Sequence, residues 1–416
     1  MSLAAARPAV LKIIEGAEVF APEPMGVKNV LIAGDRIACI QSEPFALGLG
    51  ADVVEIVDGR GKRLVPGFID GHVHILGGGG EGGYASRTPE IMLSDIIMGG
   101  VTTVVGCLGT DGITRTMANL VAKARGLEAE GITTRIYTGA YQVPVPTLTG
   151  SVMDDIVLID KVVGVGEVAL SDHRSSQPTF EEIARITAAA RVGGMLSGKA
   201  GVVNVHLGDG ERMLSIIERI IAETEIPARH FVPTHVNRNS RLFRAAAAYA
   251  KQDGGRGRYI DLTSSSAADD PGLSCGAALK SLLEAGVPIG SISFSSDGQG
   301  SLPVFSQANE YIGLGVGKVD TLFDEVRKAV RDHGVPLQEA IRVITTTPAG
   351  YLKLPGKGVI QAGADADLVL LDAGLGIHTV MAMGQIMMGE GEIKRFGTFE
   401  RDMLDALEKK KTFLKK

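Results

Sequence analysis

Short apolar runs rich in β-branched residues recur along the chain, and amphipathic stretches lie between most of them. Such runs are typical of buried strands. Eight strands are predicted, at residues 68–75, 101–108, 133–140, 162–171, 202–207, 231–236, 259–263 and 292–297. Eight strands that alternate with helices predict an α/β fold, a (β/α)8 TIM-type barrel. An open doubly wound sheet is the alternative, but no Gly-x-Gly-x-x-Gly motif follows a predicted strand.

The helices of this barrel are predicted from apolar residues at helical spacing. The clearest spans residues 211–225, with Ile217 and Ile220 on its apolar face and Asp209 as the N-cap candidate. Others are predicted at residues 89–98, 114–130, 180–191, 240–251 and 275–285.

Both ends of the chain consist of short strand-like segments and turns. Predicted strands at residues 28–32 and 36–41 flank a turn, and further strands are predicted at residues 367–371, 377–383, 385–388 and 392–395. Because chain termini often lie close together, residues 1–66 and 352–400 are predicted to form one small β-sandwich domain. The barrel then spans residues 67–351, and residues 401–416 form a C-terminal helical basic tail.

The composition narrows the class of protein. The 416 residues are 45% apolar and 22% charged, which describes a folded globular chain. A net charge of −6 without a basic stripe argues against a nucleic-acid partner. The apolar runs are too short for a membrane span. Three cysteines far apart, Cys39, Cys107 and Cys275, suit a reducing compartment, so we expect a cytoplasmic protein.

Polar side chains with metal-binding chemistry stand at the ends of four predicted strands. They are His72, His74, His206, His235 and Asp297. Residues i and i+2 of a strand point to the same face, so the first two imidazoles can converge. In a barrel the carboxyl ends of the strands meet at one rim, where active sites lie. Imidazole and carboxylate ligands with no cysteine nearby predict Zn²⁺, with Mn²⁺, Fe²⁺ or Co²⁺ as alternatives.

Four glycines and an acid, Gly77 to Glu81, follow the first pair of histidines. Glycine lets a backbone approach other atoms closely. This loop is therefore predicted to leave room for a ligand beside the metal site.

These residues stand in segments that resemble a known family. The segments are residues 66–74, 77–81, 109–111, 138–144, 171–175, 234–239 and 295–301. Together they resemble the amidohydrolase superfamily and, within it, the isoaspartyl (β-aspartyl) dipeptidase family along nearly the whole chain. The resemblance implies a metal-dependent (β/α)8 hydrolase with a β-sandwich built from both chain ends. It also implies a homo-oligomer made of dimers.

One position departs from the family pattern. The family usually bridges two metals with a carboxylated lysine at the end of strand 4, where this chain has Glu167. Lys161 lies about 20 Å away along an extended strand and cannot replace that lysine. A bulge at Gly166 is predicted to advance the shorter glutamate arm. The alternative is a mononuclear site that Glu167 does not join.

The resemblance implies a role for each site residue. Two Zn²⁺ ions per chain would be held by His72, His74, Glu167, His206, His235 and Asp297. A metal-bridging hydroxide would attack the isopeptide bond of a β-aspartyl dipeptide, with Asp297 moving the proton and Tyr141 stabilising the oxyanion. The substrate would be held by Glu81, Thr110, Tyr141, Arg174, Arg238 and Ser301.

Other functions remain open from the sequence. A related amidohydrolase could act on another amide, as an N-acyl amino acid deacylase or a cyclic amidase. A binding-only relative would lack ligands, and none is missing here. A sugar- or nucleotide-phosphate enzyme would need a phosphate cradle, for which residues 263–266 are too unspecific. The remaining histidines are predicted to be structural, with His173 also a neighbour of the ligands: His173, His230, His333 and His378.

Overall fold

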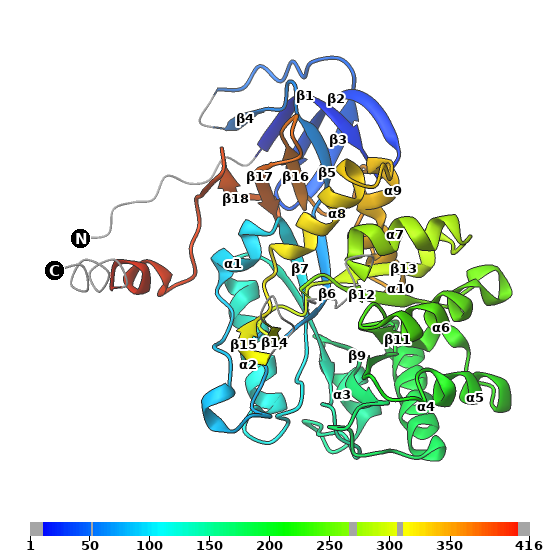
Figure 1. Ribbon diagram of the computed structural model, residues 1–416. Coiled ribbons are helices and arrows are strands. Elements are labelled where there is room, and N and C mark those ends of the chain that lie inside the picture. Colours follow the sequence, from blue (N-terminus) through cyan, green and yellow to red (C-terminus); the bar gives the residue numbers. More distant parts are fainter. Residues whose placement is uncertain (1–10, 51–52, 266–272, 306–310, 407–416) are drawn as a thin grey trace.

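Parallel strands form the centre of the larger domain, with helices around them (Figure 1). The computed structural model describes residues 11–50, 53–265, 273–305 and 311–406. Six parallel strands form one sheet: β6 (Phe68–Val73), β7 (Val101–Gly106), β8 (Thr133–Thr138), β9 (Val162–Leu170), β10 (Val202–Leu207) and β11 (Phe231–Thr234). Strands β12 (Ile260–Thr263) and β13 (Ile292–Ser295) form a parallel pair. All eight predicted strands are therefore confirmed.

Backbone hydrogen bonds close these strands into a ring at both ends of the β12–β13 pair. The Val236 amide donates to the Asp261 carbonyl at 3.2 Å, which joins the end of β11 to β12. On the other side, the His74 amide donates to the Gly298 carbonyl at 2.8 Å, which joins β6 to the end of β13. The structure is thus the predicted barrel, not an open doubly wound sheet.

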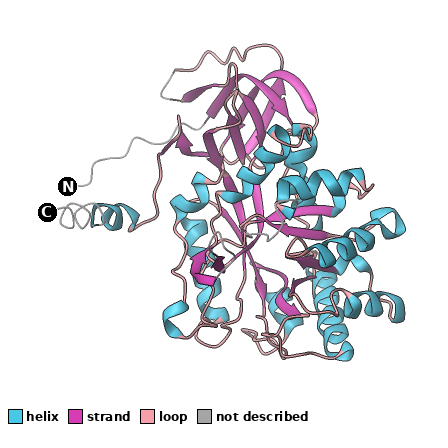
Figure 2. Ribbon diagram, in the orientation of Figure 1, coloured by secondary structure: helices cyan, strands magenta, loops and turns pink. Residues whose placement is uncertain are grey.

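Helices cover the outside of the strands (Figure 2). They are α1 (Leu93–Met98), α2 (Met117–Glu130), α3 (Val152–Leu158), α4 (Phe180–Ser197), α5 (Ser215–Glu223), α6 (Ser240–Lys251), α7 (Cys275–Glu284), α8 (Thr321–Arg331), α9 (Leu337–Ala340) and α10 (Thr346–Tyr351). Short 3-10 turns lie at Tyr84–Ser86, Ala228–His230, Gln252–Gly255, Ile289–Ser291 and Ile341–Ile344. None of the described helices is long and apolar enough to cross a membrane.

The six predicted helices are present, but α1 and α5 each begin four residues later than predicted. Helix α5 begins at Ser215 behind Leu214, and Asp209 is not its N-cap. Met213 has a left-handed backbone with φ 43°, so the chain turns there before the helix begins.

The two ends of the chain share a second sheet, as predicted. Its order is β19-β18-β17-β16-β5-β1-β2-β3, and β4 pairs with β1. Its strands are β1 (Leu11–Phe20), β2 (Pro24–Ala33), β3 (Arg36–Gln41), β4 (Val54–Asp58), β5 (Arg63–Pro66), β16 (Leu368–Leu371), β17 (Ile377–Ala382), β18 (Gln385–Gly389) and β19 (Glu392–Ile393). The blue and orange strands meet at the top of Figure 1, where Leu370 of β16 lies opposite Leu64 of β5.

The second sheet has a buried core of its own, and it also joins the core of the barrel through Val65, Val369 and Val380. Ile14, Val30 and Leu64 belong to the core of the second sheet, whereas the barrel strands pack against the surrounding helices. Domain boundaries at residues 66 and 352 remain a prediction. Residues 400–406 are helical, and the rest of the predicted basic tail, residues 407–416, lies outside the described residues.

A hairpin, β14 (Ser301–Phe305) with β15 (Tyr311–Val316), follows β13.

Candidate metal centre

Four imidazoles and two carboxylates converge at the carboxyl-end rim of the barrel. Glu167, on β9, lies in the middle, and its side chain is 1% exposed. Its Oε1 lies 3.3 Å from His74 Nε2. Its Oε2 lies 3.4 Å from His72 Nε2, 3.1 Å from His206 Nδ1 and 3.5 Å from His235 Nε2. The structure therefore brings together the predicted ligands of β6, β9, β10 and β11.

Asp297, just after β13, completes the set. Its Oδ1 lies 3.1 Å from His74 Nε2 and 3.5 Å from His72 Nε2. Asp297 has a left-handed backbone with φ 55°, and His235 has φ 62°. Residues other than glycine rarely adopt this conformation, and such residues cluster at functional sites.

Glu167 reaches the centre because β9 is bulged. Val165 lies opposite Val203, but Val168 lies opposite Val205, so β9 holds one extra residue there. The predicted bulge at Gly166 is thus confirmed. A Cβ on Gly166 would lie 2.8 Å from the Cβ of Asn204, so only glycine fits. Lys161 precedes β9 at the opposite end of the barrel, where it pairs with Glu128.

The chemistry of these residues fits divalent metal ions. Two groups of ligand atoms each lie within 4.8 Å: His72, His74, Cys107 and Glu167, and Glu167, His206 and His235. Glu167 belongs to both groups, as a bridging carboxylate must. Among the described residues, His72 Nε2, Glu167 Oε1 and Asp297 Oδ1 are buried without a hydrogen-bond partner. Buried polar atoms without partners are rare and point to an ion or ligand.

The shifted pKa values of Glu167 and His235 also suit metal binding. Burial opposes ionisation of Glu167, but the His72 charge and hydrogen bonds from His206 and His235 keep its pKa well below the usual range. Burial, with the neighbouring His206, lowers the pKa of His235 to about 3. A metal-binding carboxylate must be ionised and an imidazole must be neutral, as Glu167 and His235 are. Burial opposes protonation of His72 and His74, but Cys107 and Glu167 raise their pKa well above the usual value, so these two rings must lose a proton when a metal binds.

The outward-facing ring nitrogens are held by side chains that the sequence analysis did not single out. Asn204 Oδ1 lies 3.1 Å from His72 Nδ1, Thr263 Oγ1 lies 2.6 Å from His235 Nδ1, and Asp172 Oδ2 lies 2.9 Å from His206 Nε2. Such partners fix the tautomer of a ligating histidine. Asn204 precedes His206 by two residues, so the period of a strand could have identified it.

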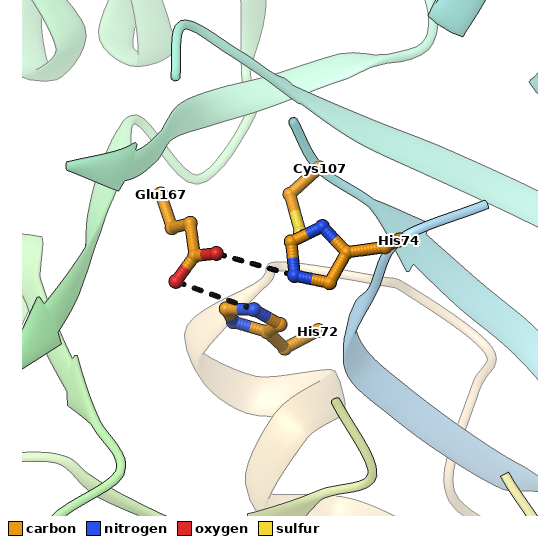
Figure 3. A group of neighbouring side chains, drawn as sticks. All are labelled: His72, His74, Cys107 and Glu167. Carbon is orange, nitrogen blue, oxygen red and sulfur yellow. Dashed lines mark hydrogen bonds and ion pairs between the residues drawn. The ribbon is translucent and has the colours of Figure 1, made fainter. Parts of the chain in front are cut away.

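A cysteine lies beside the site, which corrects the expectation that none is near. Cys107, just after β7, places its sulfur 3.7 Å from His74 Nδ1 (Figure 3). Figure 3 also shows the Glu167 carboxylate facing both rings, with one oxygen toward His72 and the other toward His74. Because the Cys107 sulfur approaches Nδ1, the Nε2 atom of His74 faces the carboxylates.

Three of the predicted substrate-binding residues lie together at one edge of the centre. Tyr141 places its hydroxyl 2.8 Å from His206 Nδ1. The guanidinium carbon of Arg174 lies 5.3 Å from the centroid of the Tyr141 ring. Glu81 Oε1 lies 3.7 Å from Arg174 Nη1. A positive and a negative group thus stand side by side at the rim.

The other predicted substrate residues surround the same rim. Arg238 donates from Nε to the Leu207 carbonyl at 3.1 Å. Ser301 Oγ is buried without a hydrogen-bond partner in the described part of the chain. Thr110 lies half-buried on the loop after β7. Their roles remain predictions.

The glycines in the loop after β6 have a different structural role from the predicted one. A Cβ on Gly77 would lie 2.3 Å from the Thr88 carbonyl oxygen, and a Cβ on Gly79 would lie 2.3 Å from that of Ser86. These glycines let two stretches of backbone pack together, and the loop then carries Glu81 to the rim.

The remaining histidines lie away from the ligand cluster. His230 hydrogen-bonds the Gly201 carbonyl at 2.8 Å, and His378 on β17 lies 2.9 Å from Thr379 Oγ1. His173 is 83% exposed, with Nδ1 3.6 Å from Asp172 Oδ1. His333 is half-buried after α8.

Comparison with known proteins agrees with this architecture. The model of the amidohydrolase family matches residues 63–387. A crystal structure of β-aspartyl dipeptidase from Fervidobacterium islandicum AW-1, in complex with β-Asp-Leu dipeptide, is 48% identical. It covers 94% of this chain and 99% of its own, with a TM-score of 0.86.

More distant relatives share the fold or a short stretch. Dihydropyrimidinase from Brevibacillus agri NCHU1002 is 16% identical, covers 93% of this chain and 97% of its own, and has a TM-score of 0.64. A dihydroorotase from Staphylococcus epidermidis is 31% identical over 94 residues, 23% of this chain and only 21% of that enzyme. The family match spans the barrel with its ligand cluster and part of the second sheet, and the chain belongs to the amidohydrolase family.

Proposed function

We propose that this protein is a binuclear metal-dependent dipeptidase that hydrolyses the isopeptide bond of β-aspartyl dipeptides. The observation that carries the proposal is the position of the Glu81–Arg174 pair, 3.7 Å apart, beside the ligand cluster. The free amino and carboxylate groups of a β-linked aspartyl residue require one acidic and one basic partner near the scissile bond. The bound β-Asp-Leu in the Fervidobacterium relative supports the same substrate class.

The metal ions of the proposal are two Zn²⁺ per chain, with Mn²⁺, Fe²⁺ or Co²⁺ as alternatives. His72, His74 and Asp297 would hold one ion, His206 and His235 the other, and Glu167 would join both. Such ions polarise an amide carbonyl and make water acidic enough to serve as a nucleophile near neutral pH.

The protein side chains bind and orient the substrate in this proposal. Glu81 pairs with the free α-amino group of the aspartyl moiety, and Arg174 and Arg238 bind the two carboxylates. Ser301 and Thr110 add hydrogen bonds. Guanidinium groups suit this task because their planar donors match a carboxylate.

Two further side chains act at the reacting amide. Burial raises the pKa of Tyr141 well above its usual value, so its hydroxyl stays protonated and can donate to the developing oxyanion. Burial opposes ionisation of Asp297 too, but the neighbouring His74 outweighs it and lowers the Asp297 pKa to about 2. The ionised carboxylate can accept a proton and pass it to the leaving amine.

The cellular setting belongs to the same proposal. Cys39, Cys107 and Cys275 are unpaired in the described structure, which suits the reducing cytoplasm. We infer a homo-oligomer from the family resemblance.

A comparison of linked isomers tests the function. Zinc-loaded protein is expected to hydrolyse β-Asp-Leu with a higher kcat/KM than α-Asp-Leu, N-acetyl-leucine or a cyclic amide such as hydantoin. Glu81→Gln is expected to raise KM for β-Asp-Leu, because it removes the charge that pairs with the amino group. Glu90→Gln is the matched control, since Glu90 pairs instead with Lys123 at 3.3 Å. Equal or faster turnover of α-Asp-Leu or N-acetyl-leucine would contradict the proposal.

A further inference from the structure

Asp172 lies between the metal ligand His206 and the substrate-facing Arg174. It follows β9 by two residues and is 5% exposed. Its Oδ2 lies 2.9 Å from His206 Nε2 and accepts from Arg174 Nη2 at 2.8 Å. Its Oδ1 accepts from Arg174 Nε at 3.0 Å and from the Arg174 backbone amide at 2.7 Å. One buried carboxylate thus holds two functional side chains.

The orientation of His206 follows from this contact. An ionised carboxylate can only accept hydrogen bonds, so Nε2 of His206 must carry the proton. The same carboxylate accepts from three Arg174 donors, the backbone amide, Nε and Nη2, so it acts as an acceptor toward His206 as well. Nδ1 of His206 faces the ligand cluster instead, 3.1 Å from Glu167 Oε2 and 2.8 Å from the Tyr141 hydroxyl.

A third close approach in this group, between Arg174 and His206, is not a hydrogen bond. Arg174 Nη2 lies 3.2 Å from His206 Nε2. Both nitrogens carry hydrogen and neither has a lone pair to accept with, so they cannot bond to each other. Both donate instead to Asp172 Oδ2, which is why the carboxylate is needed between them.

The backbone is shaped to bring Asp172 to this place. Ser171 has a left-handed backbone with φ 55°, which turns the chain after β9. Gly208, just after β10, donates its amide to the Leu170 carbonyl at 3.1 Å. A Cβ on Gly208 would lie 2.5 Å from the Cα and Cβ of Asp172. The absence of a side chain there lets the Asp172 loop pack on the end of the strand that carries His206.

We propose that Asp172 is a positioning residue that fixes His206 as a metal ligand through Nδ1 and holds Arg174 ready for the substrate carboxylate. The chain of contacts runs from Glu81 through Arg174 and Asp172 to His206. Asp172 therefore supports both metal binding by His206 and substrate binding by Arg174. This inference deepens the proposed function and rests on it for the substrate part only.

The test uses Asp172→Asn, with Asp209→Asn as the matched control. Asn keeps the size of the side chain but puts an amide NH2 group where one of the two accepting oxygens lies, so it cannot accept from all the donors of His206 and Arg174. Asp209 undergoes the same chemical change on the exposed part of the loop after β10. Zinc affinity is measured by chelator competition, which needs no substrate. We expect Asp172→Asn to weaken the second zinc by about 10- to 100-fold, the range for partners of ligating histidines.

Two further measurements separate positioning from a merely structural role. Nitrogen-15 spectra of histidine-labelled, zinc-loaded protein should show His206 bound to zinc through Nδ1 and protonated at Nε2 in the unsubstituted protein, and a mixture of binding nitrogens in Asp172→Asn. At saturating zinc, KM for β-Asp-Leu should rise more than kcat falls, because Arg174 is no longer held.

Two results would show that Asp172 does not fix His206. Unchanged zinc affinity in a folded Asp172→Asn variant, or His206 protonated at Nδ1 in the unsubstituted protein, overturns the assignment. The second result needs no variant, so it holds even if the substitution prevents folding. Normal zinc binding without β-Asp-Leu hydrolysis in the unsubstituted protein would contradict the proposed function and leave the role of Asp172 toward His206 intact.

Discussion

At the scale of single residues, the partners of each histidine separate function from structure. His230 and His235 stand at opposite ends of β11. His235 faces Glu167, whereas His230 donates from Nδ1 to the Gly201 carbonyl and buries Nε2 without a partner among the described residues. Burial lowers the pKa of His230, and Arg229, Arg191 and Lys353 add positive charge nearby. A proton on that ring would be unfavourable in the folded protein.

This contrast predicts how stability depends on pH. Because the folded pKa of His230 is below the unfolded value near 6.5, the unfolded chain binds more protons in acid. The contribution of His230 to the free energy of unfolding is therefore fully present above pH 6.5. It is lost as pH falls, by at most about 1.4 kcal/mol per pH unit. His230→Gln keeps a donor for Gly201 but cannot be protonated, so metal-free variant should lose less stability between pH 7.5 and 5.5.

Urea unfolding at the two pH values checks this prediction. His333→Gln serves as the control for the loss of an imidazole elsewhere. An equal loss of stability in His230→Gln and the unsubstituted protein would contradict it.

At the scale of single elements, the bulge in β9 moves the backbone of Glu167 toward the histidines, so its short side chain reaches them without the length of a lysine. The extra residue lies between Val165 and Val168 and lets a glutamate reach all four histidines. Gly166 makes it feasible, because its missing side chain leaves room for Asn204, the partner of His72.

Gly166→Ala should therefore disturb both strand packing and metal binding. The added Cβ meets Asn204 Cβ at 2.8 Å, and overpacking of this kind costs about 1–3 kcal/mol of unfolding free energy. Gly126→Ala in helix α2 is the control, since nothing lies within 4 Å of the added Cβ. Thermal unfolding and zinc stoichiometry measure the two effects, and a variant with normal values for both would show that the bulge tolerates a side chain.

The elements show which parts of this structure a sequence can predict. The eight barrel strands follow from buried apolar runs, and the candidate ligand cluster follows because histidines and an aspartate stand where those runs end. Asp172 and Cys107 could not be predicted in the same way, because their contacts depend on how loops after different strands pack. Helix α5 begins late for a related reason: the turn at Met213 has no sequence signal as clear as the apolar spacing behind Asp209.

At the scale of the whole molecule, the second sheet supports the strand that carries the first two ligands. Strand β5 of that sheet ends at Pro66, and β6 of the barrel begins at Phe68. The Gly67 amide between them donates to the Asp367 carbonyl at 2.8 Å, so the C-terminal segment fixes this junction. A Cβ on Gly67 would lie 2.3 Å from Thr102 Oγ1, which keeps the junction close to β7. Both ends of the chain thus help to place His72 and His74.

The central claim is that this architecture holds two metal ions with Glu167 in place of the carboxylated lysine of the family that the sequence resembles. A carboxylated lysine forms only when CO₂ adds to a neutral amine, whereas Glu167 carries its charge already. Metal-stripped protein should therefore regain two Zn²⁺ per chain in CO₂-depleted buffer. Glu167→Gln keeps the shape but loses the charge that balances two dications, so it should bind the second ion poorly.

The decisive measurement is zinc stoichiometry by elemental analysis after reconstitution without bicarbonate, for the unsubstituted protein, Glu167→Gln and the control Glu211→Gln, whose side chain is 92% exposed. We predict two zinc ions per chain in the unsubstituted protein and in Glu211→Gln, and fewer in Glu167→Gln. A requirement for bicarbonate, or two zinc ions bound normally by Glu167→Gln, would contradict it.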